Sequence, residues 1–453
     1  MTVRLDQRLS RSAAVLVILA GILMVGSPPA EAGTETCAGL PATMVGTAGP
    51  DRLDGGPGDD VIVALGGGDV ITGKGGRDVI CGGKGPDEIR GGLGGDTISG
   101  QDGHDVLDGG AGTDWVGSEG MSTNGSAYRL RFQVAGGYPE AGNDVHRGGA
   151  GRDHITFSPG NDRMFGGSGI DQASFTSEEV PFRADLARGV ASGAGSDLVA
   201  GIENLTAFTR ADITLTGDEN PNQLVGSTSS TEPFFANGGG GNDVLYSWSP
   251  SRGSNGPGPV TFLGGSGDDL IVDAFGGAEP MDVLRGGAGN DELWNRSGGA
   301  TLYGGLGDDA LIVNGRRGDK AAVGGPGTDV LRFDVDIARV YVDLSQGIFE
   351  AFRYHEAGSG TGTVAEVEDV ETESSTYGNL DDQNGDVLIG DDGPNRFNAT
   401  GGHDRIDGRG GDDSLSGGTG DDDIDGGDGT DVIDGGADQD ACRNGEQVTN
   451  CET

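Results

Sequence analysis

Residues 46–117 read GTAGPDRLD, GGPGDDVIV, ALGGGDVIT, GKGGRDVIC, GGKGPDEIR, GGLGGDTIS, GQDGHDVLD and GGAGTDWVG, eight nonapeptides in strict phase. The sixth residue of each repeat is aspartate, and the eighth is leucine, isoleucine or valine. Glycine dominates the first, second and fourth positions. Such a short, sustained period is typical of a solenoid, in which each unit packs only against its neighbours.

The spacing fits a short strand that follows a tight turn. Positions seven to nine make the strand, and only the eighth side chain points inward because side chains alternate. The six residues before it make the turn, whose glycines allow positive φ and close stacking. Two nonapeptides complete one coil, which predicts two parallel sheets around a thin aliphatic core. The predicted fold class is therefore all-β.

The same phase returns further along the chain. In most repeats, the residue two positions after the aspartate is aliphatic or otherwise apolar. The first run carries Asp51, Asp60, Asp69, Asp78, Asp87, Asp96, Asp105 and Asp114, and the second carries Asp144, Asp153, Asp162 and Asp171. A looser third run carries Asp243, Asp269, Asp282, Asp291, Asp309 and Asp329, and the last carries Asp386, Asp404, Asp413, Asp422, Asp431 and Asp440.

The pattern G-G-x-G-x-D-x-U-x, in which U is aliphatic, resembles the hemolysin-type (RTX) calcium-binding nonapeptide repeat of secreted bacterial proteins. The resemblance implies a parallel β-roll with multiple Ca²⁺ ions between successive turns. The position-six carboxylates and backbone carbonyls of the glycine loops would be the ligands, so every aspartate named above is a predicted metal ligand. Asn222, Asn395 and Ala300 replace the aspartate, and we expect weak or empty sites there.

The composition agrees with a turn-rich, cation-dependent chain. The 73 acidic residues outnumber the 29 Lys and Arg, which gives a formal net charge of −44 and argues against nucleic-acid binding. Hydrophobic residues are 34% and aromatic residues 5%, too few for one large globular core. Because a thin core cannot offset chain entropy alone, we expect the metal to supply folding energy.

Residues 1–32 have the pattern of a secretory signal peptide. Arg4, Arg8 and Arg11 precede an apolar run over 13–25, and Ala30-Glu31-Ala32 forms an Ala-x-Ala cleavage site. We expect Sec-type export, cleavage after Ala32 and an extracellular location, with an uncleaved anchor as the alternative. No later stretch is apolar enough to predict a membrane span.

Four cysteines follow this segment: Cys37, Cys81, Cys442 and Cys451. An even number in an oxidising compartment predicts two disulfides, for which three pairings are possible. We favour Cys37–Cys81 and Cys442–Cys451, because each pair joins neighbours at one end of the chain. Loop-closure entropy gives these bonds roughly 4 and 3 kcal/mol. A metal–thiolate site is the alternative, and the spacing argues against it.

Changes in composition divide the chain into segments. The repeat runs are 33–117, 139–174, an irregular 217–332 and 381–453, with an inserted β segment at 118–138 and β connectors at 175–216 and 333–380. In 118–138, alternation around Leu130 and Phe132 predicts an inserted hairpin or a surface loop. The two connectors resemble each other, since Ala184-Asp185-Leu186 corresponds to Val342-Asp343-Leu344. We expect short strands that extend or cap the solenoid.

Signatures of catalysis are missing from the sequence. The segment 355–359 begins like H-E-x-x-H but ends in Ser359, and neither G-x-S-x-G nor a P-loop occurs. We expect surface or cap positions for the four histidines within repeat units, His104, His146, His154 and His403.

The prediction is a non-enzymatic, exported calcium-binding structural protein whose β-rolls fold on extracellular calcium. Two alternatives stay open. One is a calcium-dependent adhesin or cell-surface matrix protein that binds cell-surface or extracellular polysaccharide through the connectors. The other is a secreted polysaccharide-active enzyme that carries the repeats beside its catalytic residues.

Overall fold

The computed structural model describes residues 35–117, 121–122, 131–132, 142–176, 179–193, 195–228, 232–248, 258–274, 282–296, 298–314, 319–333, 337–353, 359–372 and 385–452. Every regular element in these ranges is a β-strand. Within the same ranges, no helix has the length and apolar character that a membrane crossing requires. The predicted signal peptide and most of the predicted segment 118–138 lie outside the described residues.

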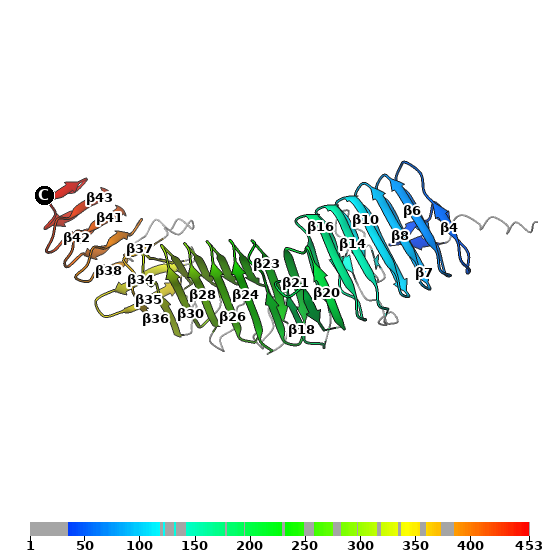
Figure 1. Ribbon diagram of the computed structural model, residues 1–453. Helices are drawn as coiled ribbons and strands as arrows, with labels where there is room; N and C mark the ends of the chain where they lie inside the picture. Colours follow the sequence, from blue (N-terminus) through cyan, green and yellow to red (C-terminus); the bar gives the residue numbers. More distant parts are fainter. Residues whose placement is uncertain are drawn as a thin grey trace, which may run out of the picture. The chain divides into compact units, whose positions relative to one another are not determined.

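Strands alternate along the chain between two stacked sheets (Figure 1). Sheet 1 contains, in spatial order, β3 (Met44–Val45), β5 (Val61–Val63), β7 (Val79–Lys84), β9 (Thr97–Asp102), β11 (Trp115–Gly117), β15 (His154–Thr156), β17 (Gln172–Thr176), β21 (Asn204–Thr209), β23 (Gln223–Thr228), β25 (Val244–Ser247), β27 (Leu270–Asp273), β29 (Glu292–Asn295), β31 (Ala310–Val313), β33 (Val330–Phe333), β37 (Asp369–Glu371), β39 (Arg396–Asn398), β41 (Ser414–Thr419), β43 (Val432–Ala437) and β45 (Gln447–Thr449). Each pairs in parallel with the next.

Sheet 2 lies opposite and contains both parallel and antiparallel pairs. Its spatial order is β4 (Arg52–Asp54), β6 (Val70–Gly75), β8 (Glu88–Leu93), β10 (Val106–Gly112), β14 (Val145–Gly151), β16 (Arg163–Gly169), β20 (Ser196–Ala200), β19 (Val190–Ser192), β18 (Phe182–Asp185), β22 (Ile213–Thr216), β24 (Phe234–Gly240), β26 (Val260–Ser266), β28 (Asp282–Ala288), β30 (Ala300–Leu306), β32 (Asp319–Val323), β36 (Ser359–Ala365), β35 (Ile348–Arg353), β34 (Ile337–Asp343), β38 (Val387–Ile389), β40 (Arg405–Asp407), β42 (Asp423–Asp425) and β44 (Ala441–Arg443). The antiparallel pairs are confined to β18–β20 and β34–β36.

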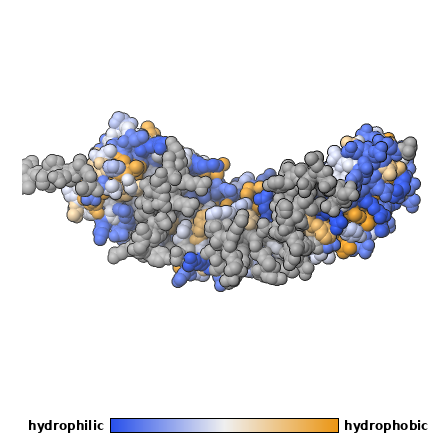
Figure 2. Space-filling view, turned by 180° about the vertical axis from the view of Figure 1, so that it is seen from behind, coloured by the Kyte–Doolittle hydropathy of each residue, from blue (hydrophilic) through white to orange (hydrophobic). Residues whose placement is uncertain are grey.

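The register places each position-eight side chain on its counterpart one coil later. Ile62 pairs with Ile80 in sheet 1, and Ile71 pairs with Ile89 in sheet 2. These side chains are fully buried between the sheets. Burying each stabilises the fold by roughly 1.5–3 kcal/mol. Where the surface in Figure 2 is coloured by hydropathy, hydrophilic residues predominate and apolar residues form scattered patches. The predicted all-β parallel β-roll is confirmed.

Both connectors continue the sheets. Sheet 1 passes directly from β17 to β21, whereas sheet 2 receives the antiparallel strands β18, β19 and β20 at the same place. The second connector repeats this arrangement with β33, β37 and the strands β34–β36. Ala32–Thr453 consequently forms one compact unit. The inserted segment contains one antiparallel pair, β12 (Met121–Ser122) with β13 (Arg131–Phe132).

The connectors also add aromatic rings to the core. The rings of Phe175 and Phe182 stack with centroids 4.1 Å apart, and Phe157 meets Phe182 edge-on at 5.0 Å. Phe333 and Phe349 form a similar edge contact at 5.8 Å in the second connector. The connectors therefore place larger side chains in the core than the aliphatic residues of the regular repeats.

His146 departs from the prediction of a surface or cap position. It occupies a position-eight site of sheet 2, in register between Leu107 and Met164, and is fully buried. Burial lowers the pKa of its imidazole to about 4, so it is neutral at neutral pH. The prediction was wrong because the repeat phase, and not the residue type, decides which side chain faces the core.

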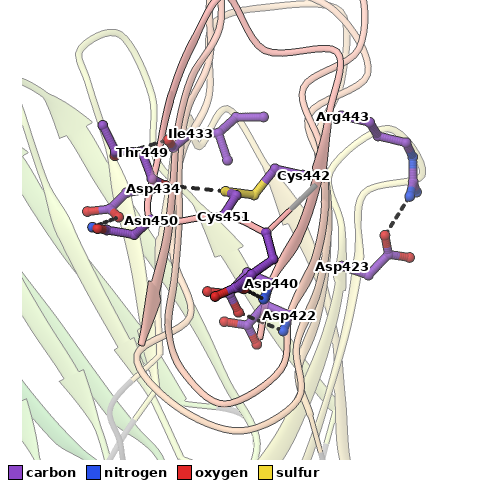
Figure 3. The surroundings of a disulfide bond; sticks show 11 residues. Asp422, Asp423, Ile433, Asp434, Asp440, Cys442, Arg443, Thr449, Asn450 and Cys451 are labelled. Carbon is purple, nitrogen blue, oxygen red and sulfur yellow. Dashed lines mark hydrogen bonds and ion pairs between the residues drawn. A yellow bond between two sulfur atoms is a disulfide. The ribbon is translucent and has the colours of Figure 1, made fainter. Parts of the chain in front are cut away.

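The favoured disulfide pairing is confirmed at both ends. Cys37, in the small β1–β2 pair (Thr36–Cys37 and Leu40–Pro41), bonds to Cys81 with a Cα–Cα distance of 5.8 Å. Cys442 of β44 bonds to Cys451, with Cα atoms 5.9 Å apart (Figure 3). The first bond holds the first coils together and the second bond holds the last coils together. At these ends of a solenoid, the outermost coil has only one stacking neighbour.

Candidate metal sites along the aspartate ladders

From Asp69 onward, the position-six carboxylates accept a backbone N–H from one coil earlier. Oδ1 of Asp78 accepts the backbone N–H of Asp60 at 2.9 Å, and Oδ1 of Asp96 accepts that of Asp78 at 2.9 Å. Asp422 and Asp440 make the same contact near the second disulfide (Figure 3). We call such a series an aspartate ladder. It satisfies a buried backbone donor that the strand pairing does not reach.

Two ladders follow the two sheets. Ladder 1 precedes the strands of sheet 1 and contains, in order, Asp60, Asp78, Asp96, Asp114, Asp153, Asp171, Glu203, Asn222, Asp243, Asp269, Asp291, Asp309, Asp329, Glu368, Asn395, Asp413, Asp431 and Glu446. Ladder 2 lies at the edge of sheet 2 and contains Asp51, Asp69, Asp87, Asp105, Asp144, Asp162 and Asp197, then Asp386, Asp404, Asp422, Asp440 and Glu452.

The second carboxylate oxygen is the unusual feature of the ladders. In many rungs Oδ2 is buried and has no hydrogen-bond partner: Asp69, Asp78, Asp87, Asp96, Asp105, Asp114, Asp153, Asp171, Asp197, Asp243, Asp269, Asp291, Asp309, Asp329, Asp413, Asp422, Asp431 and Asp440. A buried charge costs several kcal/mol unless it is paired or coordinates a metal. These oxygens therefore require a cation or a proton.

The surroundings of Oδ2 suit a hard cation. At Gly73 an added β-carbon would clash with Oδ2 of Asp78 and with the carbonyl oxygen of Gly91 in the next coil. The same two kinds of oxygen converge on Gly82, where Asp87 supplies the carboxylate. Glycine at position one thus keeps an oxygen-lined space free of side chains. Calcium takes six to eight oxygen ligands, which carboxylates and backbone carbonyls provide.

Side chains alone do not complete a site. In the part of the chain that the structure describes, no three His, Cys, Asp or Glu side chains come together in a group that could hold a metal. Each regular nonapeptide turn supplies one ladder carboxylate. A bound Ca²⁺ would therefore draw most of its ligands from the backbone carbonyls of the stacked glycine loops.

The ladders raise the pKa of their own carboxyl groups. Burial, with the Coulombic repulsion of neighbouring rungs added, raises the pKa of Asp105 and Asp114 to about 7. The pKa of Asp78 and Asp87 is raised to about 6 by the same causes. Hydrogen bonds from the preceding turn lower these values but do not compensate. Below about pH 6 to 7 these rungs are consequently protonated in the metal-free fold, and a cation would compete with the protons.

The structure brings almost all predicted ligands into the ladders. The exception is Asp282, whose Oδ1 accepts the N–H of Val260 at 2.8 Å and whose neighbours in register are Val260 and Ala300. Along 217–332 the position of the aspartate on the ladder-2 edge is occupied by the buried apolar residues Phe234, Val260 and Ala300. Asp282 and Lys320, also buried, occupy it in the remaining coils. That run therefore has one ladder, while the other three runs have two.

Several rungs escaped the sequence prediction. Asp197 is buried in ladder 2 and receives the N–H of Asp162 at 2.9 Å. Val199, two residues on and buried, was the signal that could have revealed it. The glutamates of the ladders lie in shorter turns, where a longer side chain reaches the same donor, and the repeat pattern does not identify them.

A second series of contacts runs along position five in the opposite direction. Here the earlier coil supplies the acceptor: Oδ1 of Asp59 accepts the N–H of Arg77 at 2.7 Å, and Oδ1 of Asn143 accepts that of Asn161 at 2.8 Å. His104 and His403 join this series through Nδ1. These side chains are exposed and hold the turns together without burying charge.

Comparison with protein families agrees with this geometry. A sequence model of the RTX calcium-binding nonapeptide repeat, four copies long, matches residues 45–80, 82–116, 138–173, 235–249, 281–301, 382–415 and 407–441. The chain carries RTX calcium-binding repeats in several copies. The matched ranges of these RTX repeats include most rungs of both ladders, and the connectors fall between them. No curated protein matches the chain.

Proposed function

We propose that this RTX repeat protein is an exported calcium-binding structural protein whose coils fold when they meet extracellular calcium. The unpartnered, buried Oδ2 atoms of the ladder aspartates carry the proposal. Each is a negative or protonated oxygen beside a carbonyl oxygen, and the RTX family binds calcium with such repeats. The proposal assigns the chain no catalytic role.

Calcium would act on the folded state alone, because only folding brings the oxygens of adjacent turns together. A ligand that binds the folded but not the unfolded chain stabilises it in proportion to its concentration. Without calcium, the net charge of −44 opposes compaction. Extracellular calcium modules have dissociation constants of about 10⁻⁴ to 10⁻³ M, which would keep the chain unfolded inside a cell and folded outside.

A calcium titration of residues 33–453 followed by far-UV circular dichroism tests the proposal, with magnesium as the control. We expect a cooperative coil-to-β transition at about 10⁻⁴ to 10⁻³ M calcium. Magnesium, which demands octahedral geometry and keeps its waters, should not produce it. A chain already fully folded in chelator at pH 8 would contradict the proposal. Export is tested separately, by sequencing the N-terminus of secreted protein, which should begin at Gly33.

Polysaccharide binding at the connectors is a second candidate, and one feature favours it. A groove of about 350 Å³ lies beside the second connector and is lined by polar side chains that include Glu292, Arg332, Glu371 and Arg396. The Nε of Arg332 donates to Glu371 at 2.7 Å, which holds both groups at the groove. Pull-down on acidic and neutral polysaccharides, with Arg332→Ala and Arg396→Ala as variants, tests this candidate; equal retention of the variants would exclude the groove.

A further inference from the structure

Ladder 1 changes its residue types twice, and both times in the same order. The sequence of rungs reads Asp171, Glu203, Asn222, Asp243 at the first connector. At the second connector it reads Asp329, Glu368, Asn395, Asp413. A glutamate is followed by an asparagine in each case, and aspartates lie on both sides. Two independent random losses of aspartate would not reproduce the same pair at the same place in the fold.

The glutamate closes the aspartate series before it. Oε2 of Glu203 accepts the N–H of Asp171 at 2.7 Å, and the N–H of Glu203 donates back to the carbonyl oxygen of Asp171 at 3.2 Å. Glu368 makes both contacts with Asp329, at 2.9 and 3.2 Å. Glu446 repeats them with Asp431 in the last coils. Glutamate is thus the terminal rung of each aspartate series in ladder 1.

The asparagine opens the next series by a different bond. Nδ2 of Asn222 donates to the carbonyl oxygen of Glu203 at 2.9 Å, and Nδ2 of Asn395 donates to that of Glu368 at 3.3 Å. An aspartate at this position would present an oxygen to the same carbonyl oxygen. The amide nitrogen therefore takes the place that Oδ1 has in the aspartate rungs, and the amide oxygen faces the position-one glycine, Gly217 or Gly390, in place of Oδ2. These two rungs carry no charge that a cation would neutralise.

The turns that carry these asparagines also satisfy themselves. Oδ1 of Asn222 accepts the N–H of Asp218 at 2.7 Å, and Oδ1 of Asp218 accepts the N–H of Asn220 at 2.8 Å. The turn from Gly390 to Asn395 has the same G-D-x-x-P-N sequence and the matching bonds of Asp391, at 3.0 and 2.8 Å. Neither amide oxygen is left unpartnered, unlike Oδ2 of the aspartate rungs.

Sheet 2 gives independent support at the same two places. The antiparallel strands β18–β20 and β34–β36 lie there, and ladder 2 is interrupted between Asp197 and Asp386 except for the isolated Asp282. Aromatic contacts such as Phe175 with Phe182 hold the core of the connectors instead. The carboxylates of ladder 2 therefore end at Asp197 beside the first connector and resume at Asp386 beside the second, whereas ladder 1 changes to an amide rung at both.

We propose that the two Glu–Asn steps, Glu203–Asn222 and Glu368–Asn395, are metal-free junctions that divide the calcium sites into three blocks. The blocks are residues 35–203, 222–368 and 395–452. This inference rests on the proposed calcium binding. Because a solenoid transmits stability through nearest neighbours, a junction without metal separates the calcium-driven folding of one block from the next.

Native mass spectrometry of residues 33–453 in calcium, combined with hydrogen exchange across a calcium titration, tests the junctions. Wild-type amides should become protected in separate calcium steps that coincide with the blocks. Asn222→Asp should bind one more calcium ion than wild type and bring the midpoints of the first two blocks together. Asn222→Ala, which removes the amide without adding a carboxylate, should gain no calcium. Asp243→Asn is the matched control and should lose calcium.

Each result decides one claim. If wild type binds calcium but all amides become protected in a single step, and if Asn222→Asp adds no ion, the junctions are refuted while calcium binding stands. If wild type binds no calcium, the proposed function itself fails. Repeating the substitution as Asn395→Asp keeps the test valid should the Asn222 variant fail to fold.

Discussion

Oδ1 of Asp78 accepts a hydrogen bond from the backbone N–H of Asp60, eighteen residues earlier, at 2.9 Å. Oδ2 of the same carboxylate is buried and has no hydrogen-bond partner. One side chain thus performs two tasks: the first oxygen joins consecutive coils, and the second is free for a cation. These two tasks can be separated by substitution.

Asp78→Asn should keep the bond to Asp60 and remove the charge. In chelator at pH 8, where we expect wild type to be largely unfolded, the variant should show more β-structure, because the uncompensated buried charge is gone, an effect of about 1–3 kcal/mol in unfolding free energy. In saturating calcium the order should reverse. Urea unfolding in calcium and the folded fraction from far-UV circular dichroism in chelator measure the change. Asp54→Asn, at an exposed position in β4, is the control and should change neither value by more than about 0.5 kcal/mol.

Metal-free protein should become more stable as the pH falls from 8 to 5. The pKa values of Asp105 and Asp114 are raised to about 7 in the folded state, above the ordinary value of 3.8. A group whose pKa is higher in the folded than in the unfolded state stabilises the fold fully below its unfolded pKa. This stabilisation is lost as the pH rises through the folded pKa. Far-UV circular dichroism in chelator should therefore show more β-structure at pH 5 than at pH 8.

Calcium should show the opposite dependence, because protons compete with it for the same oxygens. The calcium midpoint of folding should accordingly rise as the pH falls through about 7 to 6. A β-structure signal in chelator that falls on acidification from pH 8 to 5 would show that the ladder carboxylates do not govern the metal-free fold.

The stability of the fold should depend on glycine at position four only where another loop stacks on that glycine. Gly85 has φ of +110°, and an added β-carbon would clash with the carbonyl oxygen of Gly67 in the preceding coil. Gly58 occupies the same position of the repeat, but no atom lies within 4 Å of its added β-carbon. Gly85→Ala should cost about 1–3 kcal/mol or more in unfolding free energy, and Gly58→Ala less than about 0.5 kcal/mol. Equal effects would contradict the stacking.

Removing the first disulfide should weaken the first coils alone. The double variant Cys37→Ala, Cys81→Ala removes a crosslink between residues with a sequence separation of 44. Loop-closure entropy gives this crosslink a stabilisation of roughly 4 kcal/mol. Hydrogen exchange should rise in β5 and β7 and stay unchanged in β41 and β43. The pair Cys442→Ala with Cys451→Ala, with a separation of 9, should produce the converse at the other end and cost roughly 3 kcal/mol.

The repeat regions could be predicted from the sequence almost completely. Asp at position six and an aliphatic residue at position eight determine which side chain faces the core and which lies in the turn, because strand side chains alternate. Ile89 and Asp87 therefore lie where the phase places them. The phase also places His146 in the core, although its residue type suggested the surface.

The sequence by itself determined the all-β class, the parallel coil, the thin core and the aspartates at the turns. Those features follow from a period of nine, which is local information repeated many times. Only the tertiary structure decided that both sheets continue through the connectors, that Asp282 has apolar neighbours in register, and that Glu203 precedes Asn222 in ladder 1. These contacts join residues from turns of unequal length, so no fixed spacing along the chain predicts which of them meet.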